Sequence, residues 1–222
     1  MQHHQLIPTT VYDNFLDDPD KVREWALKLE YAKEPNGRWP GKRTKPLHEI
    51  TPAFFEMVSR KLFSQFFDLL NEQVRWQVTM CFQLIDNNYG AGWVHSDADL
   101  QHITSILYLN PDSDLNSGTS IYREKKSILQ YVNQLDNKYY GNLGIGDPKE
   151  IEESRKRHND QFEETIRINN VYNRLISFDS HLFHAAQDFS GYSKEPRLTL
   201  VMFTNDLYCT TPPVARVRKI HR

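Results

Sequence analysis

Cysteine is scarce in this sequence, which contains only Cys81 and Cys209 among its 222 residues. Two cysteines cannot build the disulfide framework of a small secreted domain, so we expect free thiols and a reducing environment. No apolar run approaches the roughly 20 residues that span a bilayer. The first residues also lack the charged and then apolar pattern of a secretion signal. Together these absences predict a cytoplasmic protein without a membrane partner.

An excess of positive charge is also missing. Lysine and arginine total 27 against 29 acidic residues, which gives a formal net charge of −2. This balance provides no general attraction to a phosphate backbone, so we do not expect nucleic acid as a partner. Internal repeats and low-complexity tracts are absent as well. The length and the ordinary apolar content therefore favour one folded domain with a sizeable core over residues 1–222.

The order of predicted elements indicates a mainly β domain with flanking helices. Residues 7–72 should hold a short strand and then helices, because Pro19 and Pro52 follow typical helix-start residues and precede apolar side chains at helical spacing. The apolar spacing after Pro52 continues to Leu70, so we expect the second helix to run that far. The main strands are expected between residues 73 and 205, where branched and aromatic residues alternate with polar ones. The predicted strands after residue 74 cover 76–86, 102–110, 117–122, 174–178 and 197–203.

Two segments do not fit this strand pattern. Residues 123–170 are polar and of mixed charge, and we interpret them as a helical insertion between strands. Residues 206–222 are expected to form a C-terminal tail. Several short strands separated by turns predict a sandwich or a barrel.

A candidate metal site emerges from two histidine motifs. His95-Ser96-Asp97 precedes a predicted strand, and residues two apart in extended chain point to the same side. His184 follows a later predicted strand. Two imidazoles and one carboxylate can occupy one face of an octahedral ion and leave the other face open. Asp99 competes with Asp97 for the carboxylate position, and His181 competes with His184.

A candidate anion site lies on two of the predicted strands. Alternation places Arg197, Thr199 and Val201 on one face of their strand. A guanidinium inside a barrel is costly unless an anion meets it, and a carboxylate can accept two parallel hydrogen bonds. The hydroxyls of Thr199 and Tyr108 could bind the same anion. The alternative interpretation of Arg197 is an ordinary surface salt bridge.

The pattern as a whole resembles the iron(II)/2-oxoglutarate oxygenase superfamily, and within it the prolyl 4-hydroxylase-like branch. The resemblance covers residues 7–30 and 80–205 and is carried, in order, by HSD, SILYLN, SGTSIY, FDSHLFHAA and PRLTLVMF. It implies a double-stranded β-helix, the jelly-roll core shared with cupins, which presents its metal at one open end.

The resemblance also implies roles for the candidate residues. His95, Asp97 and His184 would be the catalytic iron ligands, and Arg197 would anchor 2-oxoglutarate with help from Tyr108 and Thr199. The implied reaction is hydroxylation of a C–H bond with O2, releasing succinate and CO2, and ascorbate is a further candidate cofactor. A prolyl or other protein side chain is the first substrate hypothesis, with a small molecule as the second.

Other interpretations of the sequence remain open. A cupin-like metal dioxygenase or a hydrolase can use the same ligands without 2-oxoglutarate. A jelly-roll binding module would need no catalysis at all. The basic loop 38–44 either contacts substrate at the rim through Trp39, Lys42 and Arg43 or is a solvated turn. His158, which lies in the charged insertion, is expected to be solvated.

Overall fold

The computed structural model describes residues 7–97, 102–125, 135–189, 191–192 and 194–214. Its largest unit is a seven-stranded sheet, and all of its strand pairings are antiparallel. The strands follow the order β1 (Thr10–Tyr12), β8 (Leu175–Asp179), β5 (Ile103–Tyr108), β10 (Arg197–Cys209), β4 (Val74–Ile85), β3 (Lys42–Arg43) and β2 (Ala32–Lys33). A second sheet contains β7 (Phe162–Ile168), β6 (Thr119–Glu124) and β9 (Phe183–Ala186). Two antiparallel sheets with sparse helices confirm the mainly β prediction.

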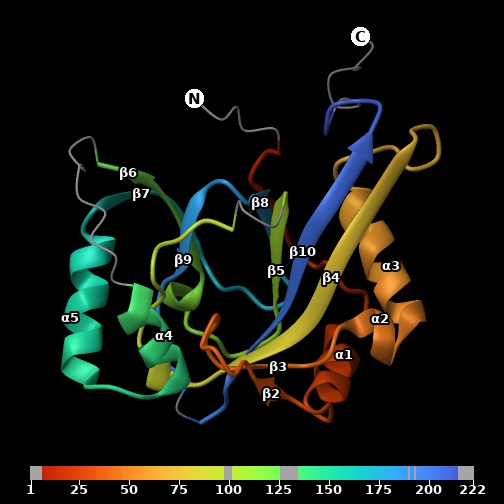
Figure 1. Ribbon diagram of the computed structural model, residues 1–222. Coiled ribbons are helices and arrows are strands. Elements are labelled where there is room, and N and C mark those ends of the chain that lie inside the picture. Colours follow the sequence, from red (N-terminus) through yellow and green to blue (C-terminus); the bar gives the residue numbers. More distant parts are fainter. Residues whose placement is uncertain (1–6, 98–101, 126–134, 190, 193, 215–222) are drawn as a thin grey trace.

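Helices flank this pair of sheets on opposite sides (Figure 1). Helices α1 (Pro19–Ala26), α2 (Leu47–Ile50) and α3 (Pro52–Phe63) lie beside the long strands β4 and β10. Helices α4 (Leu135–Leu143) and α5 (Pro148–Asn159) lie beside the smaller sheet. Short 3-10 turns occur at Asn87–Tyr89 and Leu115–Ser117. Within the described part of the chain, no helix is both long and apolar enough to span a bilayer.

Side chains alternate along the central strands, so one set lies in the main hydrophobic core and the other set lies on the opposite face of the large sheet. On β10, Leu198, Leu200 and Met202 belong to the main hydrophobic cluster, as do Met80 and Phe82 on β4. Residues at the intervening positions face the other side, where the two sheets approach each other. Because side chains of a strand alternate between faces, the predicted grouping of Arg197 with Thr199 and Val201 follows directly.

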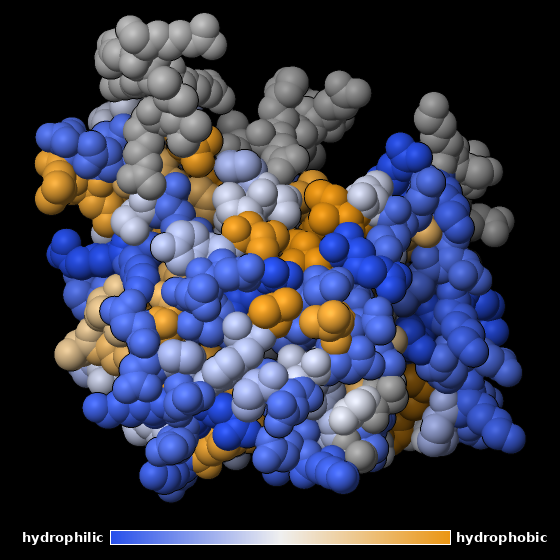
Figure 2. Space-filling model, turned by 180° about the vertical axis from the view of Figure 1, so that it is seen from behind, coloured by the Kyte–Doolittle hydropathy of each residue, from blue (hydrophilic) through white to orange (hydrophobic). Residues whose placement is uncertain are grey.

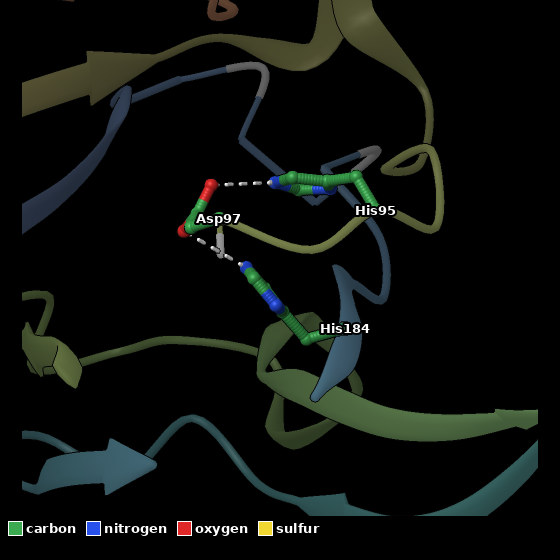
Figure 3. Close-up of side chains that lie close together, drawn as sticks. All are labelled: His95, Asp97 and His184. Atoms are coloured by element: carbon green, nitrogen blue, oxygen red, sulfur yellow. Dashed lines mark ion pairs between the residues drawn. The ribbon is translucent and has the colours of Figure 1, made fainter. Parts of the chain in front are cut away.

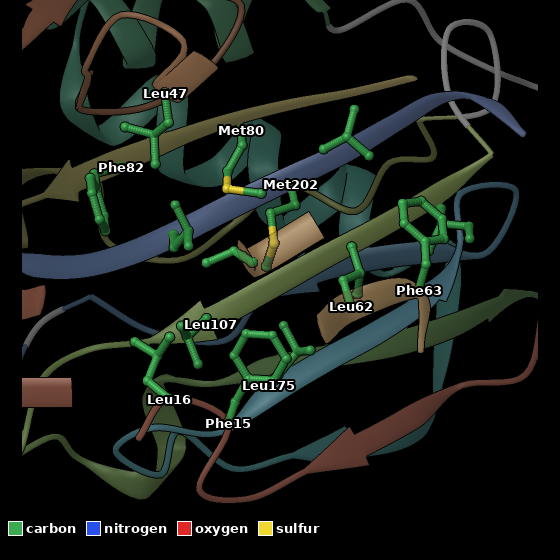
Figure 4. Close-up of a cluster of buried hydrophobic side chains, with 14 of the residues drawn as sticks. Phe15, Leu16, Leu47, Leu62, Phe63, Met80, Phe82, Leu107, Leu175 and Met202 are labelled. Atoms are coloured by element: carbon green, nitrogen blue, oxygen red, sulfur yellow. The ribbon is translucent and has the colours of Figure 1, made fainter. Parts of the chain in front are cut away.

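The main core fills the space between the large sheet and helix α3 (Figure 4). Leu62 and Phe63 from α3 are fully buried in it, and Phe63 stacks on Trp76 at a ring-centroid distance of 4.6 Å. Phe15 and Leu16, which lie in the N-terminal segment, pack into another part of the cluster. The apolar stripe of α3 thus fixes the N-terminal region onto one face of the sheet and leaves the other face free for a site.

Three sequence predictions need correction. The segment 123–170 is not wholly helical, because its last part forms β7, which pairs with β6. Helix α3 ends at Phe63, although the periodic pattern continues to residue 70. Phe66 and Phe67 are nonetheless fully buried, and the chain reaches the core there through turns. Residues 206–209 belong to β10, whose pairing with β4 resumes after a bulge, and are not part of a tail.

Candidate metal centre

Two stretches of chain bring the predicted ligands together. His95 and Asp97 lie on the segment that follows β4 and the 3-10 turn, and His184 lies on β9. Hydrogen bonds join this segment to the chain around β9, from Gly92 N to Ala186 O at 3.0 Å and from Asp97 N to Ser180 O at 3.0 Å. The two stretches are distant in sequence, and backbone pairing sets their register.

The carboxylate of Asp97 lies between the two imidazoles (Figure 3). Its Oδ1 is 3.7 Å from His95 Nε2, and its Oδ2 is 3.4 Å from His184 Nε2. One ligand atom from each residue falls within 4.8 Å of the other two. His184 is almost fully buried, whereas His95 and Asp97 are partly exposed. This arrangement suits a single ion approached from one open side.

Hydrogen bonds orient both imidazole rings. Nδ1 of His95 lies 2.8 Å from the carbonyl oxygen of Trp93, and Nδ1 of His184 lies 3.0 Å from that of Leu182. Each Nδ1 therefore donates its proton to a carbonyl, which leaves the lone pair of Nε2 for a metal. Burial, with the charges of His184 and Lys138, lowers the pKa of His95 to about 3, so its ring is neutral and able to ligate.

The carboxylate of Asp97 is held in its ionised form. Burial raises its pKa, but the adjacent imidazoles of His184 and His95 and the hydroxyl of Thr104 bring the pKa well below its usual range. Thr104 Oγ1 on β5 donates to Asp97 Oδ2 at 3.0 Å and also lies 3.0 Å from Ser180 Oγ. Thr104 thus fixes the carboxylate from behind, and no motif in the sequence indicates this role.

Helix α5 supports the ligand segment from outside. His158 Nε2 lies 2.7 Å from the carbonyl oxygen of Val94, and the side chain of Asn159 binds Val94 N at 2.9 Å and Gly92 O at 3.0 Å. The expectation of a solvated His158 is therefore wrong. Its ring faces the chain beside His95, a contact that depends on how the helix docks and has no local sequence signal.

Arg197 is buried on the interior face of the large sheet. Only 4% of its surface is exposed, and its guanidinium carbon lies 5.2 Å from the ring centroid of Tyr108 and 5.4 Å from that of Phe189. Its Nε and Nη2 atoms are buried and have no hydrogen-bond partner among the described residues. The hydroxyl of Thr199 is likewise buried and unpaired within that part of the chain. The surface salt-bridge interpretation of Arg197 therefore fails.

Tyr108 lies beside Arg197, but its hydroxyl is already engaged. It donates to Thr119 Oγ1 at 2.8 Å, and the side chain is fully buried. Burial raises its pKa, so the phenol is neutral and can act as a donor. The strand register places Tyr108 opposite Thr199 on adjacent strands, so their side chains are neighbours, as binding of one anion by both would require.

One cavity of about 1190 Å³ connects the metal ligands to Arg197. Small-molecule sites commonly occupy about 300–1,000 Å³, so this cavity can hold more than one ligand. The charged and histidine side chains on its wall are Arg38, Arg43, His95, Asp97, Lys138, Glu152, Arg155, His184 and Arg197. Its floor is the large sheet, and one wall is formed by helices α4 and α5.

The competing histidine, His181, is not part of the triad. His181 Nδ1 is 3.0 Å from Asp179 Oδ1, and His181 belongs to no described cluster of three metal-binding groups. Asp99 falls outside the described residues. The side chain of Lys42 is exposed, whereas its neighbour Arg43 lines the cavity. Of the three rim residues considered from sequence, the structure thus brings Trp39 and Arg43 to the site and leaves Lys42 outside.

The described surface opposite the view of Figure 1 is mostly hydrophilic, with small apolar patches (Figure 2).

Solved structures resemble the fold closely enough to identify its type. A prolyl hydroxylase from Trichoplax adhaerens, solved with a hypoxia inducible factor peptide, superposes with a TM-score of 0.54 at 14% identity, covering 89% of this chain and 83% of that one.

Two bacterial proteins give similar values. EvdO2 from Micromonospora carbonacea var. aurantiaca has a TM-score of 0.53 at 10% identity and covers 94% of this chain and 91% of its own. HygX from Streptomyces hygroscopicus, with nickel, 2-oxoglutarate and hygromycin B bound, has a TM-score of 0.52 at 11% identity, covering 90% and 83%. At these identities the likeness shows the fold alone, which is a jelly-roll core shared with these proteins.

Sequence comparison is less informative about activity. No curated protein matches the chain significantly. The sequence profile of one family matches residues 2–204, which is nearly the whole chain. This chain therefore belongs to DUF6445, a family of unknown function.

Proposed function

We propose that this protein is an iron(II)- and 2-oxoglutarate-dependent dioxygenase that hydroxylates a C–H bond of its substrate. The observation that carries the proposal is the pairing of two features in one cavity. A set of two histidines and one aspartate lies on one wall, and a buried arginine, with two nitrogens that no described residue pairs, lies on another. Each feature alone is compatible with several kinds of site, but the two together match a metal with a chelating, carboxylate-bearing co-substrate.

The donor set fits iron(II). Neutral imidazole nitrogens and an ionised carboxylate are good ligands for this ion, and both histidines already present Nε2 toward Asp97. His95, Asp97 and His184 would hold one face of the metal. When bound, iron(II) and 2-oxoglutarate would supply the means to activate O2 and insert one oxygen atom into a C–H bond, with release of succinate and CO2.

Arg197 fits the far carboxylate of 2-oxoglutarate. Its Nε and Nη2 atoms form one edge of the guanidinium and can donate two parallel hydrogen bonds to a carboxylate. The unpaired hydroxyl of Thr199 can donate a third bond. Tyr108 can turn its hydroxyl from Thr119 toward the same anion, or it can keep the wall of the pocket in place. An anion here would satisfy buried donors that have no partner in the described part of the chain.

The remaining wall residues control orientation and access. Phe189 and Tyr108 flank the guanidinium and keep water from it, which strengthens its bond to a carboxylate. Thr104 keeps the Asp97 carboxylate in one orientation. Substrate would enter the part of the cavity that the co-substrate leaves free. A prolyl or other protein side chain and a small molecule both remain candidate substrates, and ascorbate remains a candidate accessory reductant.

The proposal is tested by calorimetric titration of 2-oxoglutarate into anaerobic protein loaded with manganese(II) or iron(II). Wild type is compared with His184→Ala, Arg197→Ala and the control His102→Ala, whose imidazole is exposed beside β5. We expect binding that requires the metal, is lost in His184→Ala and falls at least tenfold in Arg197→Ala, because a charge-assisted bidentate contact is removed. The control should bind as wild type does.

Other outcomes lead to different functions. Metal binding without any response to 2-oxoglutarate would contradict the proposal and favour a cupin-like dioxygenase or a metal hydrolase. Failure of the wild-type protein to bind any divalent metal would leave a jelly-roll binding module. If 2-oxoglutarate binds, a substrate screen by succinate release follows directly.

A further inference from the structure

Two further cations line the cavity, and the proposed chemistry uses neither. Arg43 lies on β3 at the edge of the large sheet, and Lys138 lies on α4 in the wall formed by the insertion. Both share the cavity with His95 and Asp97. Burial lowers the pKa of both cations, and the Asp97 carboxylate acts in the opposite direction, so both lie within electrostatic reach of the metal centre.

Arg43 is held in a fixed orientation by its neighbours. Its guanidinium carbon lies 4.3 Å from the ring centroid of Trp39 and 5.2 Å from that of Phe203. Nη2 makes a long hydrogen bond of 3.5 Å to Gln83 Oε1, and Gln83 in turn donates to the Pro40 carbonyl at 2.8 Å. Nε is buried without a partner among the described residues. Stacked and incompletely bonded, this guanidinium is preorganised for an anion.

Lys138 has no ion pair within the described part of the chain, although its charge affects the pKa of nearby groups. Its side chain lines the same cavity as His95 and Asp97, and its positive charge contributes to the lowered pKa of His95 and of His158. Helix α4 is held over the cavity by Asn142, whose side chain donates to the Gly37 carbonyl at 2.8 Å. Lys138 therefore lines the cavity of the metal ligands from a wall that is tied to the loop preceding Arg43.

The remaining charged groups of the wall are accounted for. Arg155 is paired with Glu152 through two hydrogen bonds. Arg38 is exposed, and its charge acts on Glu34 outside the wall. The positive charge of a divalent metal and Arg197 together equals the negative charge of Asp97 and the two carboxylates of 2-oxoglutarate together. Binding of both ligands would thus leave the charges of Arg43 and Lys138 uncompensated in a partly closed space.

We propose that Arg43 and Lys138 form a second anion subsite, which binds the carboxylate or phosphate group of a small anionic substrate and places its C–H bond beside the metal. This inference rests on the proposed function and names its substrate class as small organic acids or phosphate esters. Arg43 would donate a hydrogen bond to the anion from Nε, and Lys138 would contribute the positive charge of its flexible side chain from the opposite wall. Trp39 keeps the arginine in place as a positioning residue.

Paramagnetic relaxation of small anions tests the subsite. Protein is loaded with manganese(II) and saturating 2-oxoglutarate at constant ionic strength, and the proton relaxation of methyl phosphate, propionate and neutral propionamide is measured during titration. We expect saturable relaxation enhancement for at least one anion and none for propionamide. The anion that responds identifies the group, phosphate or carboxylate. Affinity should fall about tenfold or more in Arg43→Gln and in Lys138→Gln.

The control variant is Lys42→Gln, which removes an exposed charge next to Arg43 and should leave the titration unchanged. Enhancement that persists in both Arg43→Gln and Lys138→Gln would show direct binding to the metal and overturn the proposal. Anion binding that disappears at saturating 2-oxoglutarate would place it at Arg197 and overturn the proposal as well. Absence of any anion response in wild type would do the same.

A separate arm distinguishes this subsite from the co-substrate chemistry. Saturation-transfer measurements with methyl phosphate and propionate on metal-free protein require neither metal nor 2-oxoglutarate. Binding there that depends on Arg43 and Lys138 supports the subsite even if the calorimetric test of 2-oxoglutarate fails. Circular dichroism of each variant confirms that a loss of binding is not a loss of fold.

Discussion

The backbones of His95 and His184 are joined by two hydrogen bonds, from His95 N to His184 O at 3.0 Å and from His184 N to His95 O at 2.8 Å. This isolated antiparallel bridge sets the two imidazoles side by side, with their ring centroids 4.4 Å apart. The metal site is thus assembled by backbone pairing before any ion binds. Because the rings are also oriented through Nδ1, little rearrangement is needed to accept a metal.

Thr104→Val should weaken metal binding without unfolding the protein. Valine keeps the shape of threonine but removes the hydroxyl that donates to Asp97 Oδ2 at 3.0 Å. Loss of a hydrogen bond that orients a metal ligand typically costs about 10–100-fold in metal affinity. Manganese(II) titration followed by electron paramagnetic resonance measures the change. Ser105→Ala, which removes a hydroxyl on the opposite face of the same strand, should leave the affinity within about twofold of wild type.

Arg197→Met should stabilise the ligand-free protein while removing co-substrate binding. The buried Nε and Nη2 atoms have no described partner, and such groups cost about 1–3 kcal/mol each, more when charged. We therefore expect the Tm of metal-free protein to rise by a few degrees, and the stabilisation by 2-oxoglutarate to vanish. Scanning calorimetry with and without ligand measures both effects. A lower Tm in ligand-free Arg197→Met would show that the guanidinium is structural.

The pair Asp13–Arg174 provides a pH-dependent contribution to stability. Arg174 Nε donates to Asp13 Oδ1 at 2.5 Å and Nη2 donates to Oδ2 at 2.9 Å, and the hydrogen bond with Arg174 lowers the pKa of Asp13. A lowered carboxyl pKa stabilises the fold above the unfolded value near 3.8, and this stabilisation is lost as pH falls through the folded value.

Asp13→Asn should therefore be less stable than wild type at pH 7, and the difference should disappear as the pH falls below the lowered pKa of Asp13 in the folded protein. The side chain of Asp13 is half exposed, so solvent screening limits the effect to at most about 1 kcal/mol. Urea unfolding at several pH values measures it. Asp17→Asn, which breaks the much more exposed pair with Lys61, should change stability by less at every pH. Equal losses in the two variants would contradict this assignment.

Gly37→Ala should separate the loop before β3 from helix α4. Gly37 has a φ of +68°, and an added Cβ would lie 2.5 Å from the Tyr139 carbonyl oxygen and 2.9 Å from Leu143 Cγ. Gly144 has a similar φ of +74° but open space around it, so Gly144→Ala measures the backbone strain alone. We expect Gly37→Ala to be less stable than Gly144→Ala by about 1–3 kcal/mol. Equal losses, measured by urea unfolding, would show that α4 moves aside without cost.

Local chemistry in the sequence is sufficient for several predictions. Strand alternation places Arg197 with Thr199 and Val201, and the register confirms that Thr199 lies opposite Tyr108. The His-x-Asp pair and the later histidine do converge, as their order relative to the strands indicates. The strand-face prediction is confirmed because a period of two depends only on nearby residues. The convergence of the two histidines also needs the backbone pairing between two segments that are distant in sequence.

Other features depend on packing between distant segments. Residues 162–168 carry a polar, mixed-charge pattern because all the residues between Phe162 and Ile168 are exposed, and only pairing with β6 makes them a strand. His158 and Asn159 meet the ligand segment because α5 docks there, and Arg43 faces the cavity because β3 pairs with β4. Sequence alone determined the chemical types available for a metal and an anion. Tertiary structure decided which cations remain without a partner inside the cavity, because charge compensation is a property of distances between segments that the chain order does not fix.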